Sequence, residues 1–332
     1  MIAQVCPEPA PISTNPLLLT EVEDQTPAPD EILLRVHACG VCHTDLHVIE
    51  GELPDARFPI IPGHQIVGVV EDIGADVNQI AIGDRVGIPW LHRTDGSCSF
   101  CQHGLENLCD QAEFTGCTVN GGYAELATIP ASFAVPIPAS FSDVDAAPLL
   151  CAGIVGYRSL RLVGLRPGER LGIFGFGAAG HLSIQVALHW GCEVYVFTRG
   201  QEHQQQSLEL GASWAGPATE DAPAKLDRAI IFAPAGELVP LALGQLQKGG
   251  VLCINAIHTS DLPSMPYSLL WNERTILTVA NATRQDANEF LPLAAEIPLQ
   301  VATQTFPLEQ ANEVLNMLKQ GEIAGAAVLQ IH

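Results

Sequence analysis

Basic residues are scarce in this sequence. Its 332 residues include 15 Lys and Arg against 37 Asp and Glu, a formal net charge of −22. Proteins that bind DNA or RNA neutralise phosphates with clustered Lys and Arg, so this balance argues against a nucleic-acid partner. It also disfavours docking on anionic membranes. An anionic ligand would need a local positive site, such as the N-terminus of a helix.

The sequence also predicts neither a signal peptide nor a membrane span. The opening stretch MIAQVCPEPAPIS has neither a basic n-region nor an apolar h-region. No run approaches the roughly 18 apolar residues that a membrane span requires. We therefore expect a cytoplasmic protein, whose ten cysteines serve as metal ligands or free thiols rather than as disulfides.

The chain has the length and composition of a globular protein with two domains. Hydrophobic residues make up 47% and charged residues 16%. The first 150 residues carry short β-type runs broken by Gly and Pro, for example over 31–40, 65–74 and 84–90. This pattern predicts a compact, barrel-like β domain with long loops.

Strands and helices alternate from residue 170 onward, which predicts βαβ units and a parallel sheet. After about residue 283 we expect two helices with a strand between them, and a final strand that returns to the first domain. The expected elements are strand 170–174, helix 178–190, strand 193–198, a Gln-rich helix ending near 212, strand 228–233, helix 237–247, the pair Gly249-Gly250, strand 251–256, helices over 287–296 and 308–321, and strand 326–331.

A glycine-rich turn lies between the first strand and the first helix of this second region. Gly175, Gly177 and Gly180, with Ala178 and Ala179, form the pattern G-x-G-x-x-G. In this context the pattern is typical of dinucleotide binding, because the glycines allow a tight turn and close approach of the pyrophosphate to a helix N-terminus. The alternative is a glycine-rich turn in another kind of α/β sheet.

The end of the next strand bears on the choice of cofactor. NAD sites place an acidic residue there, about 20 residues after the glycines, to hold the ribose hydroxyls. This chain has Thr198 and Arg199 instead. A hydroxyl and a guanidinium suit a 2′-phosphate better, so we expect NADP(H) rather than NAD(H). The alternative is that Arg199 is simply solvated.

Cys42, His64 and Cys151 are candidate metal ligands. Two Cys and one His leave a fourth position open, which is the pattern of a catalytic rather than a structural zinc. These residues are spread over 42–151 and form no local motif. Their spacing alone favours a buried cysteine beside unrelated loop residues.

Several segments in one order resemble the zinc-containing alcohol dehydrogenases of the medium-chain dehydrogenase/reductase superfamily. The resemblance runs from about residue 30 to the C-terminus, and is strongest to the bacterial branch that is similar to yeast and cinnamyl alcohol dehydrogenases. The segments are CGVCHTDLHVIEG, PGHQIVG, GDRVG, the cysteine-rich stretch around HGLENLC, GGYAE, LLCAGIVGYRSLR and GFGAAGH.

The resemblance implies an α/β fold of two parts. A GroES-like, β-barrel-type catalytic domain, residues 1–151 and 282–332, would contain a Rossmann domain with a doubly wound parallel sheet at 152–281. It also implies a homodimer or homotetramer, joined through the edge strand of the Rossmann domain, for which we expect the strand over 251–256 with the loop 261–266. It further implies a catalytic zinc on Cys42, His64 and Cys151.

The resemblance further assigns roles to residues near that zinc. Thr44 matches the hydroxyl that binds the substrate oxygen, and His47 the outer end of a proton relay that passes through the cofactor ribose. Asp45 matches the carboxylate that orients the histidine ligand, and His43 a residue beside the cofactor pyrophosphate. The family usually has Glu at position 65, and Gln65 removes one negative charge. We expect Gln65 either to slow the exchange of ligands at the zinc or to have no effect on it.

A second, structural zinc is implied by the segment 95–109. Cys98, Cys101 and Cys109 match three of the four cysteine ligands of the family, and Asp95 stands in place of the first. A carboxylate oxygen is a competent zinc ligand, so we expect Asp95 to complete the site. The alternatives are an empty lobe or recruitment of a nearby histidine, either His92 or His103.

The expected function is therefore reversible hydride transfer between a primary alcohol, aliphatic or aromatic, and NADP(H), with zinc as Lewis acid. One alternative is a zinc-free quinone or enoyl reductase of the same fold, which would have no need of the three zinc ligands. Another is a catalytically silent relative that acts as a binding protein, an idea that Gln65 and Asp95 keep open.

Overall fold

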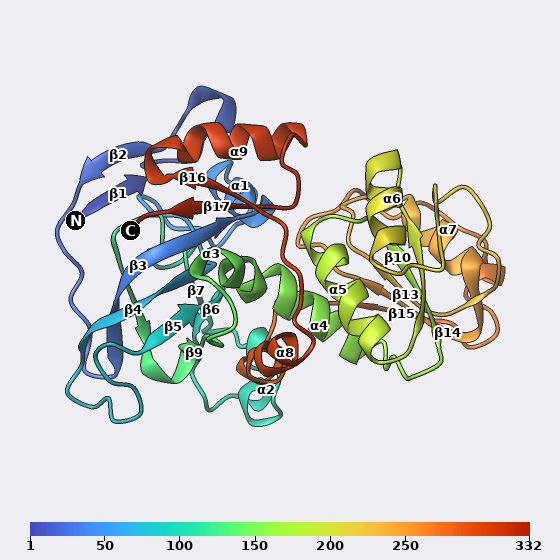
Figure 1. Ribbon diagram of the computed structural model, residues 1–332, viewed down its shortest axis with the longest axis horizontal. Helices are drawn as coiled ribbons and strands as arrows, with labels where there is room; N and C mark the ends of the chain where they lie inside the picture. Colours follow the sequence, from blue (N-terminus) through green and yellow to red (C-terminus); the bar gives the residue numbers. More distant parts are fainter. The chain divides into compact units, whose positions relative to one another are not determined.

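The computed structural model describes residues 1–332, which divide into two compact units (Figure 1). Unit 1 comprises Met1–Cys151, Ala282–Ala295 and Gln300–His332, and unit 2 comprises Ala152–Asn281 and Glu296–Leu299. This division differs from the expected domain bounds at 296–299. Within unit 2, Glu296 lies 4.0 Å from His189.

Unit 1 is built on a seven-stranded sheet in the order β16-β17-β3-β4-β5-β9, with β8 also paired to β3. The central strand β3 (Glu31–Val41) is long and almost wholly buried, and its register with β4 shifts twice, so the strand bends. The other elements of unit 1 are β1 (Ile2–Val5), β2 (Leu18–Glu21), α1 (His43–Ile49), β4 (Ile66–Ile73), β5 (Arg85–Ile88), β6 (Leu91–Arg93), α2 (Ser99–Gln102), β7 (Glu113–Phe114), β8 (Leu126–Pro130), β9 (Val135–Pro136), α3 (Asp143–Ala146), α8 (Arg284–Glu296), β16 (Thr303–Pro307), α9 (Ala311–Gln320) and β17 (Ala326–Gln330).

The C-terminal segment completes unit 1. Helix α9 is amphipathic: it buries Val314 and Leu315 in the core of this unit and ends at Gly321, whose φ of 74° forms a left-handed cap. Strand β17 pairs antiparallel with β3, with Ala327 opposite Val41. The predicted return of the final strand to the first domain is thus confirmed, and it pins the end of β3 from which the site residues follow.

Unit 2 is a six-stranded parallel sheet in the order β12-β11-β10-β13-β14-β15 with helices packed against it (Figure 1). Strand β10 is central and apolar, as expected of a strand paired on both sides. Its elements are α4 (Ala152–Leu162), β10 (Arg170–Phe174), α5 (Ala178–His189), β11 (Glu193–Phe197), α6 (Gln201–Glu209), β12 (Trp214–Gly216), β13 (Leu226–Ile231), α7 (Leu238–Gln245), β14 (Leu246–Ile254) and β15 (Thr275–Thr278).

One expected boundary in unit 2 was wrong. The helix predicted over 237–247 ends at Gln245, and the glycine pair lies inside β14 instead of forming a turn before it. Gly249 has a φ of +71°, and the pairing of β14 with β13 changes register here, which is a bulge. Glycine permits that irregular backbone, and the sequence offers no local sign that the strand continues through it. None of the helices is both long and apolar enough to cross a membrane.

Candidate zinc centres and cofactor loop

The first ligand candidate is held by the junction of β3 and α1. Cys42 is the N-cap of α1, and its Sγ accepts a hydrogen bond from the backbone N–H of Thr44 at 3.4 Å. In return, the backbone N–H of Cys42 donates to Oδ2 of Asp45 at 2.9 Å. This reciprocal capping box holds the thiol and the carboxylate at the same helix end.

The loop that carries His64 is fastened to the glycine-rich segment 121–123. Three backbone hydrogen bonds join them: from Gly121 N to Ile61 O, from Tyr123 N to Pro62 O and from Gly122 N to Gly63 O, at 2.7, 2.9 and 3.0 Å. Gly63 has a φ of +96°, and a Cβ there would lie 2.4 Å from the ring of Tyr123. Only glycine fits at that position.

The imidazole of His64 is 1% exposed and is oriented from both sides. Its Nδ1 lies 2.9 Å from Oδ1 of Asp45; since a carboxylate only accepts, Nδ1 carries the proton. This leaves Nε2 as the metal-binding atom, and it lies 3.4 Å from Sγ of Cys42. Trp90 packs edge-on against the imidazole, with ring centroids 4.9 Å apart.

Cys151 brings the third ligand atom to this cluster. It follows the short 3-10 helix Ala147–Leu150, and the ligand atoms of Cys42, His64 and Cys151 all lie within 4.8 Å of one another. Two thiols and a correctly oriented imidazole fit a tetrahedral zinc with one open position. The hydrogen bond with Cys151 and burial raise the pKa of Cys42. Burial lowers the pKa of His64, but Asp45 and Cys42 outweigh it and raise that pKa to about 10.

The other residues assigned from the resemblance lie on α1 or directly after His64. Thr44 is half-buried and His43 is exposed within unit 1. His47, later on α1, pairs through Nδ1 with Glu52. Gln65 is buried, and its amide oxygen would lie only 2.7 Å from a Cβ at Gly40, so its side chain packs against β3.

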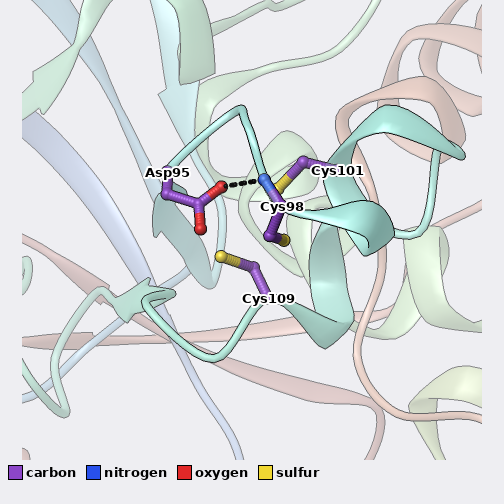
Figure 2. A group of neighbouring side chains, drawn as sticks. All are labelled: Asp95, Cys98, Cys101 and Cys109. Atoms are coloured by element: carbon purple, nitrogen blue, oxygen red, sulfur yellow. Dashed lines mark hydrogen bonds between the residues drawn. The ribbon is translucent and has the colours of Figure 1, made fainter.

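The segment 95–109 forms a second cluster, shown in Figure 2. The ligand atoms of Asp95, Cys98, Cys101 and Cys109 lie within 4.8 Å of one another. Oδ1 of Asp95 accepts hydrogen bonds from the backbone N–H groups of Ser97, at 2.7 Å, and of Cys98, at 2.8 Å. These contacts hold the pKa of Asp95 below its usual range and leave Oδ2 without a backbone partner.

The two histidines considered as alternative ligands lie outside this second cluster. The Nδ1 atom of His103 lies 2.6 Å from the carbonyl oxygen of Ser99. His92 is buried in β6, and neither histidine is among the residues whose ligand atoms come together. The donor set of three thiols and a carboxylate fits a structural zinc.

The glycine-rich turn has the backbone that dinucleotide binding requires. It follows β10 and opens α5, with Gly177 as the N-cap. Gly175 has a φ of +92°, and a Cβ at Gly180 would meet the carbonyl oxygen of Gly175 at 2.7 Å. No atom lies within 4 Å of a Cβ built at Gly177, so this backbone is open to a pyrophosphate. Ala178 and Ala179 form the first turn of the helix.

The two residues that follow β11 differ in exposure. Thr198 is buried, and its backbone N–H donates to Gly216 O at 2.9 Å. Arg199 is exposed. No carboxylate stands at this strand end.

Three contacts were not expected from the sequence. Tyr123 donates a hydrogen bond to Asp45, Trp90 packs on His64, and Glu52 pairs with His47. The five-residue spacing of His47 and Glu52 is a local signal that could have been noticed. Tyr123 and Trp90 reach the site from segments distant in sequence, so these two contacts have no local signal.

Comparison with known proteins agrees with this geometry. Residues 28–139 match the family described as alcohol dehydrogenase GroES-like domain, and residues 178–296 match zinc-binding dehydrogenase. The chain is 49% identical to a probable alcohol dehydrogenase AdhA of Mycobacterium tuberculosis, over 97% of this chain and 95% of that one. It is 35% identical to an alcohol dehydrogenase of Geobacillus stearothermophilus, over 96% and 97% of the two chains. A cinnamyl alcohol dehydrogenase of Sorghum bicolor has a similar structure, with a TM-score of 0.91 and 26% identity over 99% and 97% of the two chains.

Proposed function

Because this chain belongs to the zinc-containing alcohol dehydrogenases of the medium-chain superfamily, we propose that it interconverts primary alcohols and aldehydes with NADP(H). The chain is an NAD(P)-dependent alcohol dehydrogenase with a catalytic and a structural zinc site. The observation that carries the proposal is the meeting of Cys42, His64 and Cys151, with Nε2 of His64 turned toward the thiols. A zinc-free reductase needs no such cluster.

Each of the residues around the catalytic zinc site would have a distinct role in this reaction. Cys42, His64 and Cys151 would hold the zinc, which would supply a Lewis acid that lowers the pKa of an alcohol hydroxyl. Thr44 binds the hydroxyl of the substrate and holds its proton. His47 would be the group that exchanges a proton with solvent, with Nδ1 donating to Glu52.

The substrate class follows from the surroundings of His64. Trp90 is 9% exposed, with its ring nearly perpendicular to that of His64 and stacked on Phe114 at 5.3 Å between centroids. Such apolar surroundings favour neutral substrates, and the net charge of −22 disfavours anionic ones. We assign the enzyme to neutral, unbranched or aromatic primary alcohols and their aldehydes.

The decisive assay is oxidation of NADPH by the purified protein with benzaldehyde and with straight-chain aldehydes. Turnover that disappears when zinc is removed, and returns when zinc is added, supports the proposal. Oxidation only with quinones or α,β-unsaturated ketones would point to the zinc-free reductase. No turnover with any of these, in protein that holds zinc, would point to a binding protein.

The preference for NADP(H) rests on Arg199, an exposed guanidinium after β11 where no carboxylate stands. A 2′-phosphate would pair with it. Arg199→Ala should therefore raise the KM for NADPH about tenfold, the loss of one charge-assisted contact of roughly 1.4 kcal/mol. NADH is the internal control, because it has no 2′-phosphate, and its KM should stay within about twofold. Equal effects on both cofactors would refute this role.

The structural zinc should include Asp95. Its Oδ1 is held by backbone N–H groups, and its carboxylate lies within 4.8 Å of the three thiols (Figure 2). Elemental analysis tests this: wild type should hold about two zinc ions per chain, and Asp95→Ala about one. Asp95→Cys, which restores four thiols, should return the count to two. About two zinc ions in Asp95→Ala would show that another group is the fourth ligand.

A second copy of the chain is the proposed protein partner. The expectation that the strand over 251–256 forms this edge was wrong, because it belongs to β14, which is paired on both sides. Strand β15 is the edge of the sheet in unit 2, and the segment before it exposes Leu262, Tyr267 and Trp271, each at least 50% exposed. An open strand edge beside apolar side chains suits pairing with the same edge of another copy. Light scattering should give the mass of a dimer or tetramer, and a monomer would refute this. No nucleic-acid or membrane partner is proposed, and a cytoplasmic location stays a prediction.

A further inference from the structure

One tyrosine hydroxyl lies among the apolar side chains behind the catalytic cluster. Tyr123 is 0% exposed, and its Oη donates a hydrogen bond to Oδ2 of Asp45 at 3.1 Å. The same carboxylate accepts from the backbone N–H of Cys42 through Oδ2 and from His64 through Oδ1. Asp45, itself 1% exposed, therefore has three donors, and two of them belong to ligand residues.

The backbone of Tyr123 holds the same site from another side. Its N–H donates to Pro62 O, two residues before His64. The ring fills the space that Gly63 leaves open. A single residue thus contacts the loop that carries the histidine ligand and the carboxylate that orients the imidazole.

Packing alone does not account for the hydroxyl. Phenylalanine would fill the same volume and avoid burying a polar group, which is costly when that group lacks a partner. Here the hydroxyl has a partner, and the partner is a buried carboxylate that needs donors. The hydroxyl therefore acts through its hydrogen bond to Asp45.

We propose that Tyr123 is a positioning residue of the catalytic zinc site, which sets the orientation of His64 through Asp45. This rests on the proposed ligand set of Cys42, His64 and Cys151. Outer partners of metal ligands change metal affinity by about 10- to 100-fold when they are removed. Tyr123 is one contact further out, so about tenfold is expected for loss of its hydroxyl.

The test compares Tyr123→Phe with Tyr195→Phe. The control is matched because Tyr195 is also buried and its hydroxyl also donates to a carboxylate, that of Glu193 in unit 2, at 2.8 Å. Metal-free protein is titrated with zinc against a competing chelator, and with Co²⁺ followed by absorption. Tyr123→Phe should raise the zinc Kd of the catalytic site about tenfold and alter the Co²⁺ spectrum of that site. Tyr195→Phe should change neither, and in both variants the zinc affinity of the structural site should be that of wild type.

A double-mutant cycle separates positioning from general loosening. If Tyr123 acts through Asp45, Tyr123→Phe should add less than about threefold to the Kd in an Asp45→Asn background. A purely structural role would lower the stability of the zinc-free protein but leave the zinc Kd and the Co²⁺ spectrum unchanged. An unchanged Kd, or effects that multiply independently in the double variant, would overturn the proposal. If wild type itself bound no zinc at this site, the proposed function would fail instead.

Should Tyr123→Phe fail to fold, the wild-type sequence can be tested directly. The chain has four tyrosines, so 3-fluorotyrosine labelling gives four ¹⁹F resonances. Tyr→Phe changes at positions 157, 195 and 267 identify that of Tyr123 by elimination. This resonance should shift when zinc fills the catalytic site, because its acceptor Asp45 is then drawn toward the bound His64. A resonance that does not move on zinc binding would overturn the proposal.

Discussion

Replacing Asp45 by Asn is the most direct perturbation of the catalytic cluster. The two side chains have the same shape, so the substitution removes one charge and turns one acceptor into a donor. The carboxylate now accepts from His64 Nδ1, from the backbone N–H of Cys42 and from the Tyr123 hydroxyl. The side chain of Asn has only one oxygen, so it can accept either from His64 or from the N–H of Cys42 and the Tyr123 hydroxyl, but not from both groups of donors. Its NH2 group must therefore face either His64 or the N–H of Cys42.

The magnitude follows from that unsatisfied contact. Asp45 and His64 are each 1% exposed, so no water restores the lost hydrogen bond. A buried donor without an acceptor costs about 1–3 kcal/mol. Since about 1.4 kcal/mol corresponds to a tenfold change in Kd, zinc should bind the catalytic site roughly 10- to 100-fold more weakly, the range known for outer partners of metal ligands.

The assay is zinc titration of metal-free protein against a chelator. Asp143→Asn is the matched control, because Asp143 accepts from His37 Nδ1 at 2.8 Å and is bound by Arg85, away from any ligand cluster. We expect this control to leave both zinc sites unchanged. If Asp45→Asn bound zinc within about threefold of wild type, the assignment of His64 orientation to this carboxylate would be refuted.

Three further outcomes are expected from unit 1. Gly63→Ala forces a Cβ into the Tyr123 ring at a φ of +96° and should lower the free energy of unfolding by more than about 2 kcal/mol in urea titrations. Burial lowers the pKa of His92 to about 4, whereas the pKa of an unfolded-state histidine is about 6.5. Between these two pH values only the unfolded state binds the proton, so the free energy of unfolding should fall as the pH drops from about 6.5 to 4. His92→Phe should flatten this pH dependence. Arg284→Ala removes the fork of hydrogen bonds to the buried Glu106, the shortest 2.6 Å, and should cost about 1–2 kcal/mol of stability by the same titration, whereas Arg284→Lys should recover part of the loss.

Features that depend on neighbouring residues could be predicted from the sequence. The glycine pattern at 175–180 lies between an apolar strand and a helix, and each glycine is needed by the local backbone. The strand and helix alternation of unit 2 has the same local origin. The helix expected over 237–247 was too long because strand pairing, a long-range interaction, begins β14 at Leu246, opposite Leu226 of β13.

The two metal clusters differ in how far apart their residues lie in the sequence. Asp95, Cys98 and Cys101 are close in sequence, so their grouping is built by one short turn whose N–H groups bind Asp95. Cys42 and Cys151 are far apart, and their spacing alone argued against a site. The resemblance to a family, rather than the chemistry of the intervening residues, predicted that they meet.

The sequence by itself therefore determined the parallel sheet, the dinucleotide turn and the types of residue available to bind zinc, because local periodicity and glycine backbone requirements suffice for these. Only the tertiary structure decided that Asp45 and Tyr123 share a hydrogen bond across 78 positions of the chain and that Trp90 packs on His64. Those contacts arise where β3, the His64 loop and the segment 121–123 meet in one core, and such long-range packing has no local signature.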